Sequence, residues 1–396
     1  MRKEIKSIDD KNISFLIVDD MSNMRRTIKN MLKYIGYKNF YEAPNGLLAY
    51  AKLQTHPINF IITDLNMPVM DGIEFIKKVR EDKEYRYVPI IIISGENDKD
   101  IIANAAEIGA DGYLVKPFLV TTLETKIKEV IDSLINPSRA TYHFLKGCKY
   151  LETKSYKEAL NFFKDAIKID PKFSKAYGGM AKVFIENNQL DKAEKVLQEA
   201  IKVNKSYIEG YHLLGEIYEK KNNFEKAIEY FEKAYSLNPK NSERTFNLGN
   251  LNIKTKNYSK AKEYFQNLKK EAKNNKELLL KVGDILLENE LTDDAINFYN
   301  KLADELPNYL VVYNRLGIAY RKQKKFDEAI ESYNKALIFG NKEDERVYYN
   351  IGRCYFDKGD IEKAIEYMKK ALKINPKFEE ASKALSFFEK KRKNEI

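Results

Sequence analysis

Small residues recur at an interval of 34 residues through the last two thirds of this chain. They are Gly147, Ala181, Gly215, Gly249, Gly283 and Gly317, with Gly352 following after 35 residues. Alanines keep a second register with the same interval, and a large apolar residue follows each one by four positions, as Phe163 follows Ala159. A repeat of this length is a pair of helices that cannot bury its apolar face alone, so neighbouring pairs stack into a solenoid with a concave groove.

The residue types at these positions explain the interval. Small residues let two paired helices approach closely, and the large apolar side chains fill the space beside them, so most Tyr and Phe residues here belong to the core. We expect seven repeats over residues 140–378, beginning near 140, 174, 208, 242, 276, 310 and 345, and a capping helix over 379–396. The pattern resembles the tetratricopeptide-repeat family, which implies an α-solenoid.

The first helix of each repeat should line the concave groove. At matching positions these helices carry Asn247, Asn250, Asn314, Arg321, Arg346, Asn350 and Arg353. Asn and Arg spaced along a groove can hold an extended peptide by its backbone and its carboxylates. We therefore expect a protein or peptide partner there, an acidic one included, while ordinary solvated polar positions are the alternative.

The first 136 residues alternate between strand-like and helical patterns. Short apolar runs at 14–18, 39–43, 58–62, 89–93 and 111–115 alternate with helical patterns at 22–35, 46–53, 73–79, 99–108 and 119–134. Five such units predict a doubly wound, flavodoxin-like parallel sheet of five strands. The whole chain is therefore expected to combine an α/β domain at 1–136, a short linker at 137–139 and the all-α repeats.

Polar residues follow four of these strands. They are Asp19 and Asp20 after the first, Asp64 after the third, Ser94 after the fourth and Lys116 after the fifth. The carboxyl ends of parallel strands share one edge of a sheet, so these side chains should converge there. Clustered carboxylates call for a cation, and oxygen ligands suit Mg²⁺, with Mn²⁺ as the alternative. No His or Cys lies at these ends, which argues against zinc.

This set of side chains also suggests a reaction. A carboxylate can accept a phosphoryl group to give an acyl phosphate, while Lys116 and the metal offset charge on the transferred group. Ser94 would donate a hydrogen bond to a phosphate oxygen once the group is attached. The alternative is an acidic patch in which Lys116 serves only as a salt bridge.

The segments 19–20, 64–72, 94–95 and 116–118 together resemble the receiver domain of two-component response regulators, especially the single-domain chemotaxis regulator. The resemblance implies that Asp64 is the phospho-acceptor and that a histidine kinase is the donor. It implies that Asp20, Asp64 and the main-chain carbonyl of Asn66 bind Mg²⁺, with Asp19 acting through water.

The same resemblance assigns the remaining roles. Ser94, where many relatives carry Thr, and Lys116 would hold the phosphoryl group, and Tyr113 would be the aromatic switch that turns inward on activation. Asn66 and Glu96 match a pair that flanks the acceptor in the chemotaxis regulator, which implies a short-lived acyl phosphate. The short break at 136–138 lacks a flexible tether, so we expect the last helix before it to lie close to the first repeat helix.

Composition narrows the remaining function classes. Residues 1–137 hold 19 basic against 20 acidic residues, which leaves 50 against 39 for the rest of a chain with net charge +10. A nucleic-acid-binding regulator is therefore an alternative, but no basic block or helix-turn-helix pattern supports it, and we expect no nucleic acid partner. Another alternative is a receiver domain that docks on chemotaxis or motor proteins, with the repeats as a tether.

The sequence also bears on location and catalysis. Two distant cysteines fit a reducing compartment, and no apolar run approaches the roughly 20 residues of a membrane helix, so we expect a cytoplasmic protein without a membrane span. The repeats hold no nucleophile–base pair, so we expect no enzyme activity beyond self-phosphorylation and self-hydrolysis at Asp64. The pattern does not indicate an oligomeric state.

Overall fold

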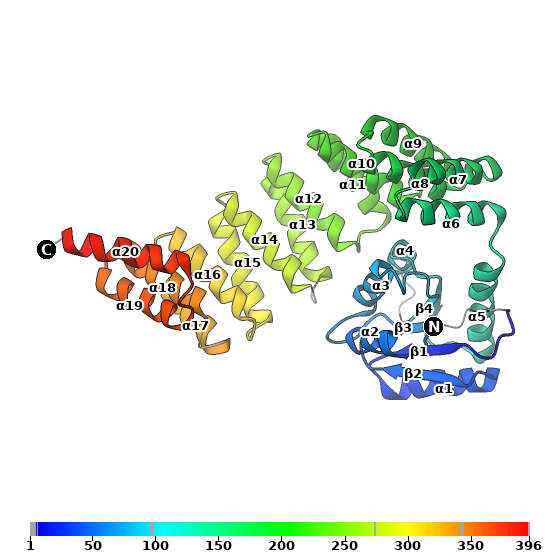
Figure 1. The fold of residues 1–396 in the computed structure, drawn as a ribbon, viewed down its shortest axis with the longest axis horizontal. Helices are drawn as coiled ribbons and strands as arrows, with labels where there is room; N and C mark the ends of the chain where they lie inside the picture. The colour runs from blue at the N-terminus through cyan, green and yellow to red at the C-terminus, as the bar shows by residue number, and fades with distance from the viewer. Residues whose placement is uncertain (1–4, 6, 96–98, 273–274, 341–343, 395–396) are drawn as a thin grey trace. The chain divides into compact units, whose positions relative to one another are not determined.

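The computed structural model describes residues 5, 7–95, 99–272, 275–340 and 344–394 (Figure 1). The chain divides into two compact units, residues 1–274 and 275–396. The first unit contains a five-stranded sheet with its helices, followed by α6 to α13, and the second contains α14 to α20. None of the helices in the described ranges has both the length and the apolar character that a bilayer crossing requires.

Five parallel strands form one sheet in the order β2-β1-β3-β4-β5. Their bounds are β1 Ser14–Val18, β2 Asn39–Ala43, β3 Phe60–Asp64, β4 Ile90–Ser94 and β5 Gly112–Val115. Strands β1, β3 and β4 are buried along their whole length, as expected for a parallel sheet covered on both faces. The predicted doubly wound, flavodoxin-like fold is confirmed.

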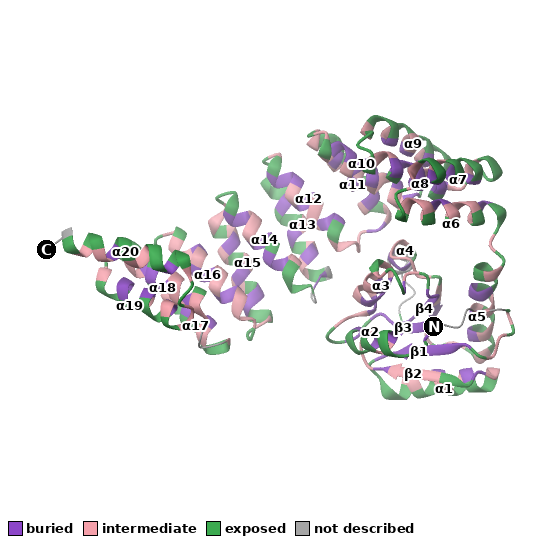
Figure 2. Ribbon diagram, in the orientation of Figure 1, coloured by how far each residue is buried: buried purple, intermediate pink, exposed green. Residues whose placement is uncertain are grey.

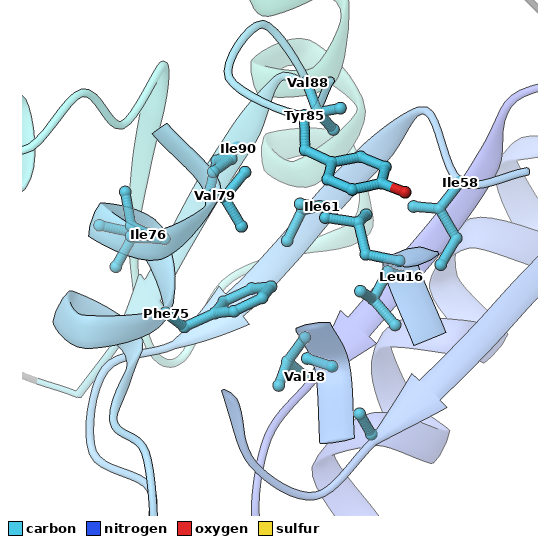
Figure 3. Close-up of a cluster of buried hydrophobic side chains, with 14 of the residues drawn as sticks. Leu16, Val18, Ile58, Ile61, Phe75, Ile76, Val79, Tyr85, Val88 and Ile90 are labelled. Carbon is cyan, nitrogen blue, oxygen red and sulfur yellow. The ribbon is translucent and has the colours of Figure 1, made fainter. Parts of the chain in front are cut away.

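Helices cover both faces of the sheet. Helices α1 (Ser22–Ile35) and α5 (Val120–Ile135) pack on one face, and α2 (Gly46–Thr55), α3 (Gly72–Glu81) and α4 (Lys99–Glu107) supply the core of the other. Buried residues follow the strands and the inner sides of the helices (Figure 2). On the second face Phe75, Ile76 and Val79 of α3 lie against Leu16 and Ile61 of the strands (Figure 3).

The third strand begins and ends two residues later than the apolar run at 58–62 suggests. Asn59 pairs with Ser14 before the strand begins, because its backbone N–H donates to the Ser14 carbonyl at 3.1 Å and its Oδ1 accepts from the Ser14 N–H at 2.8 Å. Asp64 is the last residue of β3, in register with Ile93 of β4.

The remaining helices come in pairs whose first members begin 34 or 35 residues apart. The first members are α6 Arg139–Glu152, α8 Ser174–Glu186, α10 Ile208–Lys220, α12 Ser242–Lys254, α14 Lys276–Glu288, α16 Leu310–Lys322 and α18 Glu345–Lys358. The second members are α7 Tyr156–Ile169, α9 Leu190–Val203, α11 Phe224–Leu237, α13 Tyr258–Glu271, α15 Thr292–Glu305, α17 Phe326–Phe339 and α19 Ile361–Ile374. Helix α20, Glu379–Asn394, packs on α19.

The recurring small residues sit where the two helices of a pair touch. A Cβ atom on Gly147 would lie 2.6 Å from the ring of Phe163, and one on Gly215 would lie 2.8 Å from Phe231, closer than real side chains approach. Gly249 with Phe265, Gly283 with Tyr299 and Gly317 with Tyr333 repeat this contact. The predicted close approach of paired helices, filled by large side chains, is therefore what the structure shows.

The N-terminal domain meets the repeats through side chains that the sequence did not single out. Ser138 caps α6, since its Oγ accepts a hydrogen bond from Thr141 N at 3.1 Å. Glu152, at the end of α6, accepts hydrogen bonds from Arg86 Nη1 at 2.8 Å and Tyr87 OH at 2.7 Å. These bonds come from the segment before β4 and add to the short chain connection between α5 and α6.

Candidate functional site

Three charged side chains meet at the carboxyl edge of the sheet. Lys116 Nζ donates to Asp19 Oδ2 at 2.8 Å and to Asp64 Oδ1 at 2.9 Å. Asp19 directly follows β1, Asp64 ends β3 and Lys116 directly follows β5. The chain order of a parallel sheet thus brings together residues that lie up to 97 positions apart.

The two carboxylates of this cluster are buried, and the charges of the cluster do not balance. Asp19 is 1% exposed and Asp64 is 9% exposed. Burial raises the pKa of Asp64 above its ordinary value, and Lys116, which acts in the opposite direction, does not outweigh it. Burial lowers the pKa of Lys116, but its hydrogen bonds to the two carboxylates outweigh that effect and hold its pKa above the ordinary value. One ammonium shared by two carboxylates leaves one negative charge in the cluster.

Hydrogen bonds fix the backbone around the two aspartates. Asp19 Oδ1 accepts from Met21 N at 2.9 Å, and Arg25 Nη1 donates to the Asp19 carbonyl at 2.6 Å. The Thr63 hydroxyl donates to the Asp64 carbonyl at 2.9 Å. Gly72 is required next to the same carbonyl, because a Cβ there would overlap it. Thr63 and Gly72 therefore fix the backbone of Asp64, the candidate phospho-acceptor.

Ser94 and Tyr113 lie on the two neighbouring strands. Ser94 is the last residue of β4 and is 1% exposed, and its carbonyl accepts a hydrogen bond from Lys116 N at 2.7 Å. Tyr113 is a half-buried residue of β5 and packs against the core cluster that includes Ala105 of α4. Both residues therefore belong to the strands that flank the charged cluster on one side.

Asp20 and Asn66 differ from the buried pair. Both are exposed, in the loops after β1 and β3, and Glu96 lies outside the described residues. In the described ranges no three His, Cys, Asp or Glu residues are grouped so that they could hold a metal ion. Asp19 and Asp64 are joined through Lys116, and Asp20 is the exposed neighbour of Asp19 in the chain.

The donor atoms at this edge nevertheless fit a hard divalent cation. The candidates are the carboxylates of Asp19, Asp20 and Asp64 and the main-chain carbonyl of Asn66, all of them oxygens of the kind that Mg²⁺ prefers. The negative charge that remains after Lys116 is counted also favours a cation. The oxygen ligands and the remaining negative charge at this edge of the sheet therefore suit Mg²⁺.

Several of the groove candidates are already engaged in the second unit. Asn350 Nδ2 donates to Asn314 Oδ1 at 2.9 Å, which joins the first helices of two successive pairs. Arg321 Nη1 donates to Asp357 Oδ2 at 2.9 Å, and the Arg321 side chain is only 15% exposed. These contacts stabilise the stacking of neighbouring pairs, so Arg321 serves a structural role in this arrangement.

The other groove candidates remain accessible. Arg346 and Arg353 are exposed on α18, and the Arg353 guanidinium lies 5.8 Å from the centre of the Tyr349 ring. In the first unit Asn247 and Asn250 are half-buried on α12.

A second cluster, which none of the sequence patterns indicates, joins the N-terminal domain to the repeats. Arg244, near the start of α12, is fully buried and forms an ion pair with Glu107 at the end of α4. Asn238 and Asn241 of the turn before α12 also donate to the Glu107 carboxylate. A buried arginine within a helical repeat is rare unless it is paired.

A comparison of the repeats in register would have revealed Arg244. Five positions before each recurring small residue the other pairs carry Tyr142, Ala176, Gly210, Leu278, Val312 and Val347. Only the pair that begins at α12 has a charged residue at this place. Read alone, Arg244 looks like an ordinary polar surface residue, but the period identifies it as a charge at an apolar position.

Comparisons with known proteins agree with both parts of the fold. The model of the response regulator receiver domain matches residues 15–128. The model of the C-terminal ARM domain of tetratricopeptide repeat protein 21 matches residues 125–267, and a tetratricopeptide repeat model matches 312–377.

Individual relatives cover one part of the chain each. The chemotaxis protein CheY-3 of Vibrio cholerae is 41% identical over 130 residues, which are 33% of this chain and 100% of that protein. The structure of the chemotaxis response regulator CheY4 of Vibrio cholerae is 36% identical, covers 30% of this chain and 98% of its own, and has a TM-score of 0.29. A tetratricopeptide repeat protein from Parabacteroides merdae is 17% identical, covers 63% of this chain and 98% of its own, and has a TM-score of 0.38. The chain therefore belongs to the response regulator family, with an N-terminal receiver domain and tetratricopeptide-type repeats in its C-terminal region.

Proposed function

We propose that this response regulator accepts a phosphoryl group on Asp64 from a histidine kinase and that the repeats transmit its state to a protein partner. The observation that carries the proposal is the shared position of Lys116 between Asp19 and Asp64. Burial makes the Asp64 carboxylate more basic, and the Lys116 ammonium beside it can offset charge on the transferred group. A carboxylate in this position is suited to receive a phosphoryl group.

The transfer balances without a further reactant. An oxygen of Asp64 attacks phosphorus, the P–N bond to the kinase imidazole breaks, and its electron pair returns to the imidazole nitrogen. Lys116 then offsets charge on the phosphoryl oxygens, and the Ser94 hydroxyl donates a hydrogen bond to one of them. Mg²⁺, held by Asp20, Asp64 and the Asn66 carbonyl with Asp19 acting through water, would neutralise charge on the phosphoryl group, and Mn²⁺ has the same ligand preference. Water later hydrolyses the acyl phosphate, and no external substrate is turned over.

The repeats supply the output in this proposal. Seven repeats over 140–378, closed by the helix at 379–396, would hold a protein or peptide segment, with the accessible Arg346 and Arg353 favouring an acidic one. Phosphorylation adds about −1.5 to −2 charges at the sheet edge, and Tyr113 packs against the α4 side of the core, so a response of Tyr113 would reach α4. We place the protein in the cytoplasm, in keeping with its two free cysteines.

Labelling with a small phosphodonor tests the acceptor directly. Purified protein is treated with acetyl phosphate and Mg²⁺, and the mass increase of a single phosphoryl group is followed by intact-protein mass spectrometry. Asp64→Asn should abolish the acid-stable, hydroxylamine-sensitive product. Asp132→Asn, an exposed aspartate on α5, is the matched control and should label as the native protein does. Undiminished labelling of Asp64→Asn would refute the assignment.

A further inference from the structure

The Arg244 cluster is built as a receptor for a carboxylate. Arg244 Nη1 is fixed by the carbonyls of Asn238, which follows α11, at 3.0 Å and of Ala234, in the last turn of α11, at 3.3 Å. This leaves Nη2 to donate to Glu107 Oε1. The guanidinium is therefore positioned by the repeats themselves, and only its outer amino group faces the receiver domain.

Both oxygens of the Glu107 carboxylate are satisfied. Asn241 Nδ2 donates to Oε1 at 3.0 Å, and Asn238 Nδ2 donates to Oε2 at 2.7 Å. The two amides are themselves held in place, because Asn241 Oδ1 accepts from Arg244 N at 3.0 Å and Asn238 Oδ1 accepts from Lys240 N at 3.1 Å. Three donors converge on one carboxylate, and the turn before α12 orients all of them.

The charge of this receptor has to be balanced from outside the repeats. Arg244 is 0% exposed, and a buried guanidinium without a counter-ion is strongly destabilising. Its carboxylate partner comes from the receiver domain, and the matching positions of the other repeats need no such partner because they carry no charge. The charge is thus unnecessary for the repeat fold, which points to recognition.

The second attachment between the domains is weaker. Arg86 and Tyr87 share Glu152, but the Arg86 and Glu152 side chains are 22% and 40% exposed. Ion pairs with this much exposure to solvent contribute little to stability. Glu107 is therefore the main anchor of the receiver domain on the repeats.

We propose that Asn238, Asn241 and Arg244 form a carboxylate-binding site of the repeats, that Glu107 occupies it as an internal ligand, and that a glutamate side chain of a partner peptide takes the same place once the receiver domain leaves. One site holds one carboxylate, so the receiver domain and the partner compete. Glu107 is tethered, and its high effective concentration keeps the site closed to weak external ligands.

A competition experiment with the full chain tests this proposal. The probe is a fluorescein-labelled hexaglutamate peptide, and its binding is measured by fluorescence anisotropy at constant ionic strength. Glu107→Gln removes the internal charge with little change in shape, so the probe should bind this variant at least about tenfold more tightly than the native chain. Adding Arg244→Leu, the residue that the next repeat carries at Leu278, should abolish the gain.

Two further variants make the result decisive. Asn238→Asp keeps the size of the side chain and its bond to Lys240 N but places a carboxylate inside the site, so it should also abolish the gain in the Glu107→Gln background, even where Arg244→Leu fails to fold. Lys220→Gln, which removes an exposed charge elsewhere on the repeats, should leave the gain intact. Equal binding by the native chain and Glu107→Gln would overturn the proposal, and so would binding that survives Asn238→Asp.

Discussion

The first unit contains two paired cations, the half-buried Lys116 and the fully buried Arg244, and their surroundings differ in one respect. Lys116 is shared by two carboxylates, Asp19 and Asp64, whereas Arg244 faces the single carboxylate of Glu107 with two neutral amides beside it. The first cluster keeps an excess negative charge and the second is neutral. An unbalanced cluster is suited to take up a further cation or to transfer charge, and a balanced one is suited to hold two surfaces together.

Removal of Lys116 should produce the largest effect on stability. Lys116→Met leaves two buried carboxylates unpaired, and we expect the free energy of unfolding to fall by about 3–5 kcal/mol at pH 7. Urea denaturation measures this loss. The loss should shrink as the pH falls and the carboxylates take up protons, and a loss that is the same at pH 4 and pH 7 would show that packing, not charge, is responsible.

Neutralisation of Glu107 should have a smaller effect, because Arg244 keeps its two backbone carbonyls. We expect Glu107→Gln to lower the free energy of unfolding of the first unit by about 1–3 kcal/mol. Glu219→Gln is the control, since Glu219 forms a half-exposed ion pair with Lys254, and it should cost less than about 1 kcal/mol. If the two variants lose the same free energy of unfolding, Glu107 does not balance the buried charge of Arg244.

Divalent cations should distinguish the two clusters. Only the Lys116 cluster has an uncompensated charge, so Mg²⁺ at about ten times its Kd should stabilise the native chain by about 1.4 kcal/mol. Thermal unfolding with Mg²⁺ and with EDTA gives the difference. Asp64→Asn should remove it and Glu107→Gln should not, whereas a difference that Asp64→Asn leaves intact would place the ion elsewhere.

Substitution of Asp64, the proposed acceptor, should stabilise the protein. Burial raises the pKa of Asp64, so the folded state holds the proton more tightly than the unfolded state and loses stability as the pH rises through that range. Asp64→Asn removes this penalty, and we expect a gain on the order of 1 kcal/mol at pH 7. The gain should vanish below the ordinary aspartate pKa of about 3.9, and a constant gain across this range would contradict the explanation.

The fold could be predicted from the sequence because its patterns are strong. The apolar strands and the 34-residue interval depend on many residues each, so single exceptions do not obscure them. The apolar run at 58–62 places the third strand two residues too early, because the pairing of Asn59 with Ser14 appears only when the two segments lie side by side. Local composition does not carry that information.

The candidate site was predicted in part for a related reason. The order of parallel strands brings Asp19, Asp64 and Lys116 together, but it does not determine whether Asp20 turns inward or into water. Arg244 was missed because its partner, Glu107, is 137 residues away and belongs to another fold. The role of a single charged residue depends on such a contact between distant residues, and no local sequence pattern shows that contact.

Each large side chain fills the space beside the recurring glycine of its own pair, as Phe231 does beside Gly215, but neighbouring pairs share the rest of the core, since Phe163 also lies against Gly179 of the next pair. A pair that is gained or lost during evolution therefore has to repack against its neighbours. The receiver domain has its main contact with this array at one place, the turn before α12. Loss of a pair after α13 would leave this contact in place. Loss of a pair before α12 would move the turn by 34 residues and detach the receiver domain. The two ends of the array are therefore free to diverge in length to different degrees.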